Sequence, residues 1–255
     1  MQPTKPLSSN ATSIFHLDPT AVKDPALIAE LTSWLDANEL ARMNRLLHQD
    51  HRHSFLISHA LMRKALGTEL KLHPAELKFV SGQRGKPRVA NAEIATPMAF
   101  SLTHTGRLAA IAIDESPIGL DAEWLNRGHI NMKIADRYFT PREREDINAA
   151  QLENLQRRFL TFWTLKEAYL KAEGLGIVDG LDTFEFHLER KEQTETIERA
   201  ILHVIDPKST PSQHWHFWHC TPTAEHLMSV AIALHENRQV PLINCRSWQP
   251  DDWEK

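Results

Sequence analysis

Cysteine is scarce in this chain, whose 255 residues include only Cys220 and Cys245. Two cysteines are too few for a disulfide framework, so the sequence predicts a protein of the reducing cytoplasm. Long apolar runs are also missing, and none approaches the ~18 residues of a membrane span. The first residues lack the basic and then apolar pattern of a secretory signal. We therefore expect a cytoplasmic protein that does not enter a membrane.

An excess of positive charge is absent as well, because the formal net charge is −4. This balance argues against a general nucleic-acid binder. The charge is unevenly distributed, however, and ten lysines and arginines stand against three acidic residues between Arg42 and Arg88. A basic surface of this kind suits a small polyanion or an acidic partner protein, although most of these side chains taken singly are equally explained as solvated helix positions.

The pattern of hydrophobic residues predicts an α+β protein. With 42% hydrophobic and 24% charged residues, a chain of this length can bury a sizeable core. Helical patterns cover 36–48, 51–66 (ending at Gly67) and 140–176, the last with an interruption near 149–154. Strand patterns cover 13–17, 77–81, 98–104, 108–114, 118–123, 183–188, 201–205, 214–220 and 227–234. Helices precede strands in each half, so we expect two similar halves, residues 1–115 and 116–255.

Two carboxylates occur on one predicted strand, in the segment IGLDAEWL (118–125). Alternate side chains of a strand share a face, so Asp121 and Glu123 point to the same side. Carboxylates ~7 Å apart repel each other unless a cation lies between them, and hard oxygen ligands suit Mg²⁺. The alternative is the solvated edge of an amphipathic strand, which this short motif alone would favour.

A third carboxylate, Glu167, belongs to the helical segment FWTLKEAYLKAEG (162–174). Paired with Lys171 on an exposed face, it would contribute only ~0.2–0.5 kcal/mol. Trp163 and Leu170 lie on the same helical face, however, and a carboxylate on a buried face needs a partner. A metal ion shared with the strand carboxylates is a stronger partner than Lys171 alone. Lys166 points about 100° away around the helix and is expected to pair elsewhere or to face solvent.

Ordered motifs link these residues to a known family. GLDAE (119–123) and FWTLKEAYLK (162–171) resemble the paired signature of the Sfp-type 4′-phosphopantetheinyl transferases. SLTHTGR (101–107) and RGKP (84–87) resemble two further segments of that family, and HQDHRHSFLISHALMR (48–63) is similar to its first conserved helix. The matches follow the family order and cover roughly residues 40–188.

The resemblance implies a fold of two pseudo-symmetric α+β halves with the active site at their junction. The first half would contact coenzyme A and the carrier protein, and the second would supply metal-binding acids and the long helix. The implied reaction is attack by a serine hydroxyl of an apo acyl, peptidyl or polyketide carrier protein on the β-phosphate of coenzyme A. The phosphopantetheine arm is transferred and 3′,5′-ADP leaves. Mg²⁺, or Mn²⁺, would be the cofactor, and two fused halves could complete the site in a monomer.

The resemblance also implies roles for individual residues. Asp121, Glu123 and Glu167 would bind the metal together with the pyrophosphate, and Lys171 would contact phosphate. The serine's proton would pass to Glu167 or to a metal-bound water. The remaining coenzyme A contacts would come from the first half, at Lys86, Thr103, His104, Arg45 and Arg52.

Each of these first-half residues is assigned to the coenzyme A site for a different reason. Lys86 and His104 would hold the nucleotide's phosphates, His104 the 3′-phosphate. Thr103 supplies a hydroxyl where the family usually has serine. Arg45 or Arg52 could replace a lysine that some relatives carry where this chain has Gln49.

Two other functions remain alternatives on the sequence alone. A catalytically inactive relative could bind a carrier protein as a scaffold, but it would not need all the acids together with Lys171. An unrelated Mg²⁺ phosphohydrolase could use the same acids, but it should lack Lys86 and His104. The segment HWHFWHC (214–220) could suggest zinc, yet a strand whose rings pack on a core explains it better.

Overall fold

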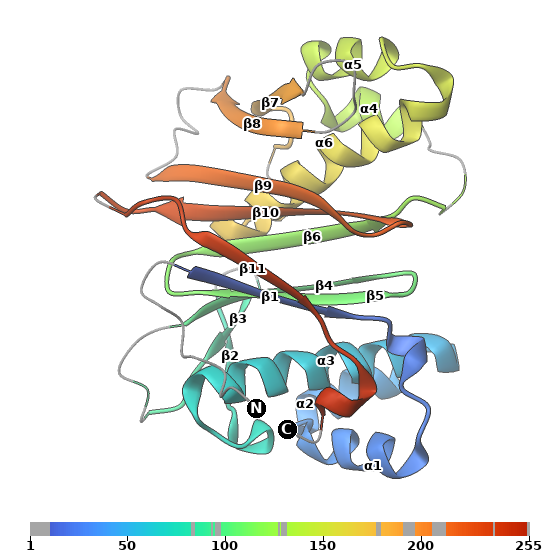
Figure 1. Ribbon diagram of the computed structural model, residues 1–255, viewed down its shortest axis with the longest axis vertical. Helices are drawn as coiled ribbons and strands as arrows, with labels where there is room; N and C mark the ends of the chain where they lie inside the picture. Colours follow the sequence, from blue (N-terminus) through green and yellow to red (C-terminus); the bar gives the residue numbers. More distant parts are fainter. Residues whose placement is uncertain are drawn as a thin grey trace. The chain divides into compact units, whose positions relative to one another are not determined.

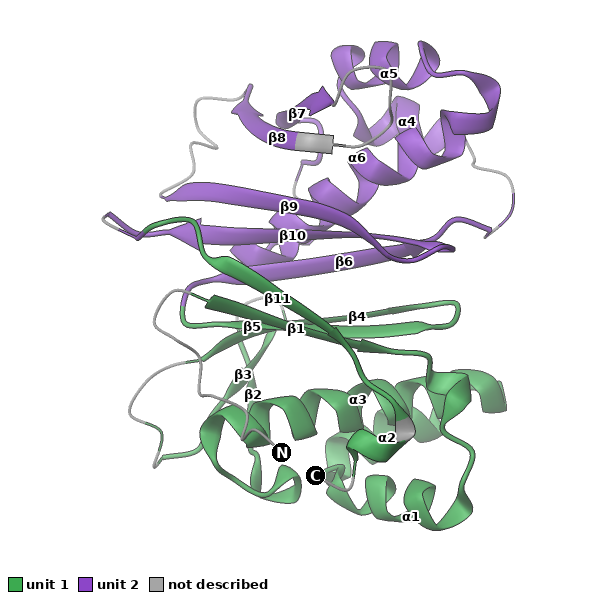
Figure 2. Cartoon of the chain, viewed as in Figure 1, with its two compact units in different colours: residues 1–115, 239–255 green, residues 116–238 purple. Residues whose placement is uncertain are grey.

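The structure is a computed structural model that describes residues 11–82, 85–92, 94, 98–126, 128, 132–176, 180–190, 197–205, 213–236 and 238–253. The chain divides into two compact units (Figure 2). Unit 1 comprises residues 1–115 and 239–255, and unit 2 comprises residues 116–238. None of the described helices is both long and apolar enough to cross a lipid bilayer.

Unit 1 is a sheet covered on one side by helices (Figure 1). Its elements are β1 Ala11–Leu17, α1 Pro25–Trp34, α2 Ala37–Asn44, α3 Gln49–Leu70, β2 Phe79–Ser81, β3 Pro87–Val89, β4 Ala99–Thr105, β5 Leu108–Asp114 and β11 Leu242–Ser247. The main sheet has the order β11-β1-β5-β4, and β2 and β3 form a separate hairpin. The core of the unit lies between α3 and this sheet, where Leu61, Leu66 and Ile111 are fully buried.

The C-terminal segment belongs to unit 1 and not, as the sequence predicts, to the second half. The reason is that β11 pairs in parallel with β1, with Ala11 opposite Leu242. Beyond β11, Trp253 is buried in the core of unit 1 and Trp248 packs against that core.

Helix boundaries in unit 1 follow local signals in part, and α2 ends at Asn44 where the sequence predicts a helix to residue 48. Asp36 caps α2 and forms a reciprocal capping box with Glu39, as the sequence indicates. The predicted end of α3 at Gly67 is wrong, because α3 continues to Leu70 and ends with Lys71 in the left-handed conformation. Gly67 is instead required by packing, since a Cβ there would lie 2.6 Å from the carbonyl oxygen of Leu72.

Unit 2 repeats this plan with its own elements. They are β6 Ile118–Trp124, α4 Met132–Tyr138, α5 Pro141–Asn148, α6 Leu152–Glu173, β7 Phe184–Arg190, β8 Ile197–Val204, β9 His214–Thr223 and β10 His226–Leu234. The sheet has the order β6-β10-β9, and β7 and β8 form a separate hairpin. Helix α6 packs on β6 and β10 (Figure 1).

The helical region formed by α5 and α6 begins, breaks and ends where the sequence predicts. Thr140 caps α5 and forms a capping box with Glu143, with a proline at the first helical position. The chain leaves the helix between α5 and α6, and α6 ends at Gly174, whose φ is +71°. The α+β class is therefore confirmed. Helices α1 and α4 and strands β3 and β11 were not predicted, although Asp24 caps α1 and a proline stands at its first position.

Candidate active site

A close approach between helix α6 and strand β6 builds the site, and Gly119 permits it. A Cβ on Gly119 would lie 1.9 Å from the carbonyl oxygen of Ala168 and 2.5 Å from the nitrogen of Ala172. No other residue fits there without moving the helix. Because strand side chains alternate, Asp121 and Glu123 share the face of Gly119 that α6 covers. The glycine thus sets α6 directly over the two carboxylates.

Asp121 and Lys171 form the central ion pair of this site. The Nζ atom of Lys171 donates to Oδ1 of Asp121 at 2.7 Å and to the carbonyl oxygen of Leu120 at 3.1 Å. The other carboxylate oxygen of Asp121, Oδ2, is buried without a hydrogen-bond partner. Burial raises the pKa of Asp121 to about 6, against the lowering effect of Lys171, and Glu123 raises it further. One oxygen of this carboxylate therefore remains available for a ligand.

Glu167 reaches the same pair of strand carboxylates from α6. Its side chain is half-buried, and Oε1 is buried without a hydrogen-bond partner. Burial raises the pKa of Glu167 to about 7, and the charges of Asp121 and Glu123 raise it further while Lys171 lowers it. The three carboxylates are therefore close enough to repel each other, as the sequence predicts for acids that share a cation.

These carboxylates suit a hard divalent cation, although they are not assembled around one. Within the described part of the chain, no group of three or more His, Cys, Asp or Glu side chains has the geometry to hold a metal ion. The buried oxygens of Asp121 and Glu167 without hydrogen bonds are the donors that such an ion needs, and carboxylate oxygens match the preference of Mg²⁺. Lys171 supplies positive charge to Asp121 in the present arrangement.

A buried polar row beside Asp121 was missed by the sequence reasoning. Ser229 on β10 lies opposite Asp121, and His219 on β9 lies opposite Ser229. The hydroxyl of Ser229 is hydrogen-bonded to Thr164 of α6 at 2.8 Å and to Nδ1 of His219 at 2.9 Å. Burial lowers the pKa of His219 to about 4, so its ring is neutral at pH 7. A single serine within the apolar strand HLMSVAIAL was the signal that could have identified this row.

Lys166 is fully buried, so the alternative that it faces solvent is wrong. The other alternative, that it pairs with a different residue, is confirmed. Its Nζ atom lies 2.8 Å from Oε2 of Glu143 and donates to the carbonyl oxygens of Leu181 at 2.5 Å and Phe184 at 2.8 Å. Burial lowers the pKa of Lys166, against the effect of Glu143. This contact fixes α6 to α5 and to the segment that leads into β7.

Of the basic candidates of unit 1, Arg45 follows α2, Arg52 lies in the first turn of α3 and Lys86 precedes β3. Arg45 is exposed, and its Nε donates to the carbonyl oxygen of Ala41. Arg52 is half-buried, and its Nη1 donates to the carbonyl oxygen of Leu46. Lys86 is half-buried, and Arg84 of the same motif lies outside the described residues.

Thr103 and His104 lie on opposite faces of β4, because they are neighbours in a strand. Thr103 is buried, whereas His104 is exposed near the end of the strand. One face of β4 therefore cannot present both side chains to a ligand. Arg63 is a further departure, since it is fully buried and so does not belong to the basic surface that its neighbours suggest.

Comparison with known proteins gives the family. Residues 117–233 match the 4′-phosphopantetheinyl transferase superfamily, and residues 24–116 match the family described as 4′-phosphopantetheinyl transferase, N-terminal. The 4′-phosphopantetheinyl transferase HetI of Nostoc sp. is 30% identical over 227 residues, which cover 89% of this chain and 85% of the relative. The 4′-phosphopantetheinyl transferase Sfp of Bacillus subtilis is 28% identical over 161 residues, covering 63% of this chain and 70% of the relative. The chain therefore belongs to the 4′-phosphopantetheinyl transferase superfamily and is a transferase of the Sfp type.

Proposed function

We propose that this transferase moves the 4′-phosphopantetheine group of coenzyme A to a serine of an acyl or peptidyl carrier protein, with Mg²⁺ as cofactor and 3′,5′-ADP as the second product. Its family uses coenzyme A as substrate and acts on carrier proteins. One observation carries the proposal at the level of the site. Asp121 and Glu167 each keep a buried carboxylate oxygen without a partner, beside a lysine that can meet phosphate.

The donor set suits Mg²⁺, which would be held by Asp121, Glu123 and Glu167. Bound there, the ion would neutralise charge on the pyrophosphate, which is the main requirement of phosphoryl transfer. Lys171 would exchange its contact with Asp121 for one with phosphate, because the metal would then neutralise the carboxylate. Gly119 and the packing of α6 on β6 hold these side chains in place before substrate arrives.

Glu167 is the candidate to accept the proton of the carrier's serine. A general base works best when its pKa is near the working pH, and the pKa of Glu167 is raised to about 7 by burial and by the neighbouring carboxylates. Metal binding would lower this value, so the choice between Glu167 and a metal-bound water depends on the loaded site. Ser229 and Thr164 form the hydrogen-bonded support of α6 next to it.

Coenzyme A contacts from unit 1 belong to the proposal as well. Lys86 and His104 would bind phosphates of the nucleotide, and Arg45 or Arg52 would replace the lysine that is missing at Gln49. Thr103 is the weakest of these candidates, because it is buried and lies on the opposite face of β4 from His104.

One experiment separates this function from the two alternatives. The protein is incubated with coenzyme A, MgCl₂ and an apo carrier protein, and the carrier is then weighed by mass spectrometry. We expect a gain of about 340 Da, the mass of the phosphopantetheine arm. A scaffold relative would bind the carrier without changing its mass, and a phosphohydrolase would degrade coenzyme A while the carrier stayed unmodified. An unchanged mass for fatty-acid, polyketide and peptide-synthetase carriers alike would overturn the proposal.

A further inference from the structure

Strand β10 brings a hydroxyl group next to the carboxylate of Asp121. Ser229 lies directly opposite Asp121 in the antiparallel ladder of β10 and β6. Side chains at opposite positions share a face of the sheet, with Cβ atoms about 4.5–5.5 Å apart. A serine hydroxyl at this distance is able to donate a hydrogen bond to the carboxylate. Oδ2 of Asp121 nevertheless has no hydrogen-bond partner, so the hydrogen of Ser229 is directed elsewhere.

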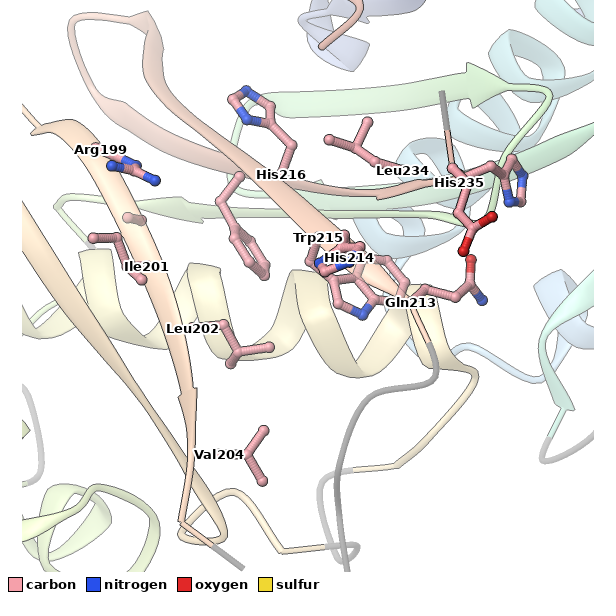
Figure 3. A pocket seen from close by; sticks show the side chains of 13 residues that line it. Arg199, Ile201, Leu202, Val204, Gln213, His214, Trp215, His216, Leu234 and His235 are labelled. Carbon is pink, nitrogen blue, oxygen red and sulfur yellow. The ribbon is translucent and has the colours of Figure 1, made fainter. Parts of the chain in front are cut away.

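The same face of the sheet continues onto β9 with His219. His219 lies opposite Ser229 in the ladder of β9 and β10. Trp215, four residues earlier, is on the same side of the strand, and its ring packs against Tyr169 of α6. Figure 3 shows this alternation at the start of β9, where Trp215 lies against α6 and His216 points to the opposite side. The histidine, the serine and the carboxylate therefore form one row beneath α6.

Thr164 of α6 determines where the hydrogen of Ser229 goes. Oγ1 of Thr164 is 3.1 Å from the carbonyl oxygen of Thr161 and 2.8 Å from Oγ of Ser229. A threonine hydroxyl has one hydrogen, and a carbonyl oxygen can only accept a hydrogen bond. Thr164 therefore donates to Thr161 and accepts from Ser229.

The same count fixes the hydrogen on the ring of His219. Nδ1 of His219 is 2.9 Å from Oγ of Ser229, whose single hydrogen is already donated to Thr164. The serine oxygen can only accept from the ring, so Nδ1 carries a hydrogen and donates it. Burial and the charge of Arg157 lower the pKa of His219 to about 4, so the ring is neutral at pH 7 and Nε2 carries no hydrogen.

We infer that a one-way hydrogen-bond chain keeps the hydrogen of Ser229 away from Asp121 and so leaves Oδ2 of that carboxylate free to bind a cation. The chain runs from Nδ1 of His219 through Ser229 to Thr164 and ends at the carbonyl oxygen of Thr161. Its side chains act through Asp121 and are positioning residues, not ligands. The direction of the chain stands on the hydrogen bonds alone, whereas its role at Asp121 rests on the proposed Mg²⁺ site.

A hydrogen bond from Ser229 would compete with a cation for the same oxygen of Asp121. Hydrogen bonds to charged groups are stronger than those between neutral groups, so a cation would have to displace a firmly held hydrogen. Changes to groups that hydrogen-bond around metal ligands typically cost 10–100-fold in metal affinity. The acceptor that Thr164 offers to Ser229 is therefore expected to strengthen cation binding.

The first test measures the direction of the chain in the full-length protein without substrate or metal. Long-range ¹H–¹⁵N NMR spectra at about pH 7.5 distinguish the two neutral tautomers of a histidine. We expect the Nδ1–H tautomer for His219, whose ring signals are identified by their loss in His219→Gln. Ser229→Ala removes the acceptor of Nδ1 and should shift this ring towards the Nε2–H tautomer. An Nε2–H tautomer in the unmodified protein overturns the inference.

The second test measures Mn²⁺ affinity from the electron paramagnetic resonance signal of free Mn²⁺. Thr164→Val leaves Ser229 without its acceptor, so the serine can donate to Asp121 and the affinity should fall about tenfold. Removing that hydroxyl as well, in Thr164→Val/Ser229→Ala, should return the affinity to within about threefold of the unmodified protein. Thr164→Ser keeps the hydroxyl and Thr161→Val keeps the carbonyl oxygen, so both controls should bind Mn²⁺ normally.

The double variant distinguishes this chain from a row that only holds α6 in place. For such a row, removing two hydroxyls would lower the affinity at least as much as removing one. A double variant that binds Mn²⁺ no better than Thr164→Val therefore overturns the role at Asp121. Absence of Mn²⁺ binding in the unmodified protein would contradict both the proposed cofactor and this role, while the tautomer of His219 still decides the direction of the chain. Transfer to the carrier, measured by mass, tests the proposed reaction separately.

Discussion

The two units anchor their long helices in the same way, yet unit 2 alone places a carboxylate next to the anchor. Helices α3 and α6 both have 22 residues, and each carries a fully buried basic residue at the same position, Arg63 in α3 and Lys166 in α6. Each basic residue pairs with the capping-box glutamate of the short helix that comes before, Glu39 or Glu143. The buried pair is therefore part of the shared plan of the fold.

The segments after the helices are held in the same manner. Arg63 donates to the carbonyl oxygens of Pro74 and Leu77, and Lys166 donates to two carbonyl oxygens, one just before β7 and one at its first residue. The difference begins one residue later, where α3 has Lys64 and α6 has Glu167. Helix α6 also packs on β6, which carries Asp121 and Glu123, whereas α3 packs mainly on β5 and β4. The carboxylates of the proposed site are thus a few positions added to a repeated scaffold.

Removing the buried basic residue should cost the most, and by similar amounts in both units. Lys166→Met and Arg63→Met each remove the lysine or arginine partner of a buried glutamate, which costs about 3–5 kcal/mol of unfolding free energy, with the loss in unit 1 at the lower end because Glu39 keeps its contact with His59. Urea unfolding of the full chain measures the loss. Changing the glutamate as well, in Lys166→Met/Glu143→Gln, should recover part of it. If either variant kept its stability unchanged, Arg63 and Lys166 would not hold their helices in the same way.

Exchanging the residue after the anchor should affect unit 2 only. Glu167→Gln removes the proposed metal ligand and candidate base, so we expect turnover to fall by about 10²–10³-fold while the fold is kept. Lys64→Gln is the matched change on α3 and should leave turnover within about twofold. Turnover is measured as phosphopantetheine transfer, and circular dichroism verifies folding. If Glu167→Gln retained most activity, Glu167 would be a structural residue.

The glycine that brings α6 onto β6 gives a third comparison. Gly119→Ala forces the helix away from the strand, which should cost about 1–3 kcal/mol or more and lower turnover by displacing Glu167 from Asp121. Gly67→Ala in α3 also meets a backbone oxygen, at 2.6 Å, but no site residue depends on that contact. Unfolding and turnover of both variants are measured together. Loss of turnover in Gly67→Ala equal to that in Gly119→Ala would contradict this account.

The smallest expected effect is a pH-dependent stabilisation by magnesium. The folded pKa values of Asp121 (about 6) and Glu167 (about 7) lie above the unfolded values, so the folded state binds these protons more tightly. The stabilisation from these protons is complete below the unfolded pKa values and is lost as the pH rises through about 6 and about 7. Mg²⁺ should replace the protons, and therefore MgCl₂ should raise the melting temperature more at about pH 8 than at about pH 5.5.

The control for this effect is the double variant Asp121→Asn/Glu167→Gln, in which MgCl₂ should change the melting temperature equally at both pH values. In unit 1 the buried carboxylate of Glu39, the counterpart of Glu143, behaves differently from Asp121 and Glu167. Hydrogen bonds from His59 and Arg63 outweigh burial and lower the pKa of Glu39, so unit 1 should lose this contribution only at acidic pH. A magnesium effect of the same size at both pH values in the unmodified protein would contradict metal binding by the raised carboxylates.

Local signals were enough to predict most elements and the shared face of Asp121 and Glu123, whereas Glu167 was grouped with them through the expected helix packing and the family resemblance. Capping boxes at Asp36 and Thr140 fixed two helix starts, and alternation in β6 predicted that Asp121 and Glu123 share a face. Packing decided the features that were missed. Gly67 has the appearance of a helix end, but its lack of a side chain serves a contact with Leu72.

Burial and pairing were the hardest properties to read from the sequence. Lys166 is charged and adjacent to Glu167, so helical geometry alone allowed it to face solvent, whereas its partner Glu143 is distant in the sequence. The row formed by Ser229, Thr164 and His219 joins three elements and has no local signature. The pairing of β11 with β1 joins the two ends of the chain, and no local sequence pattern in either strand indicates it.

That pairing separates the order of synthesis from the order of folding. Unit 2 is one continuous stretch of chain, so it can finish folding as soon as residue 238 has left the ribosome. Unit 1 is synthesised first, but its edge strand β11 and the buried ring of Trp253 arrive last. Unit 1 therefore completes its sheet only after unit 2 has been synthesised. Until then, the edge of β1 that pairs with β11 stays exposed.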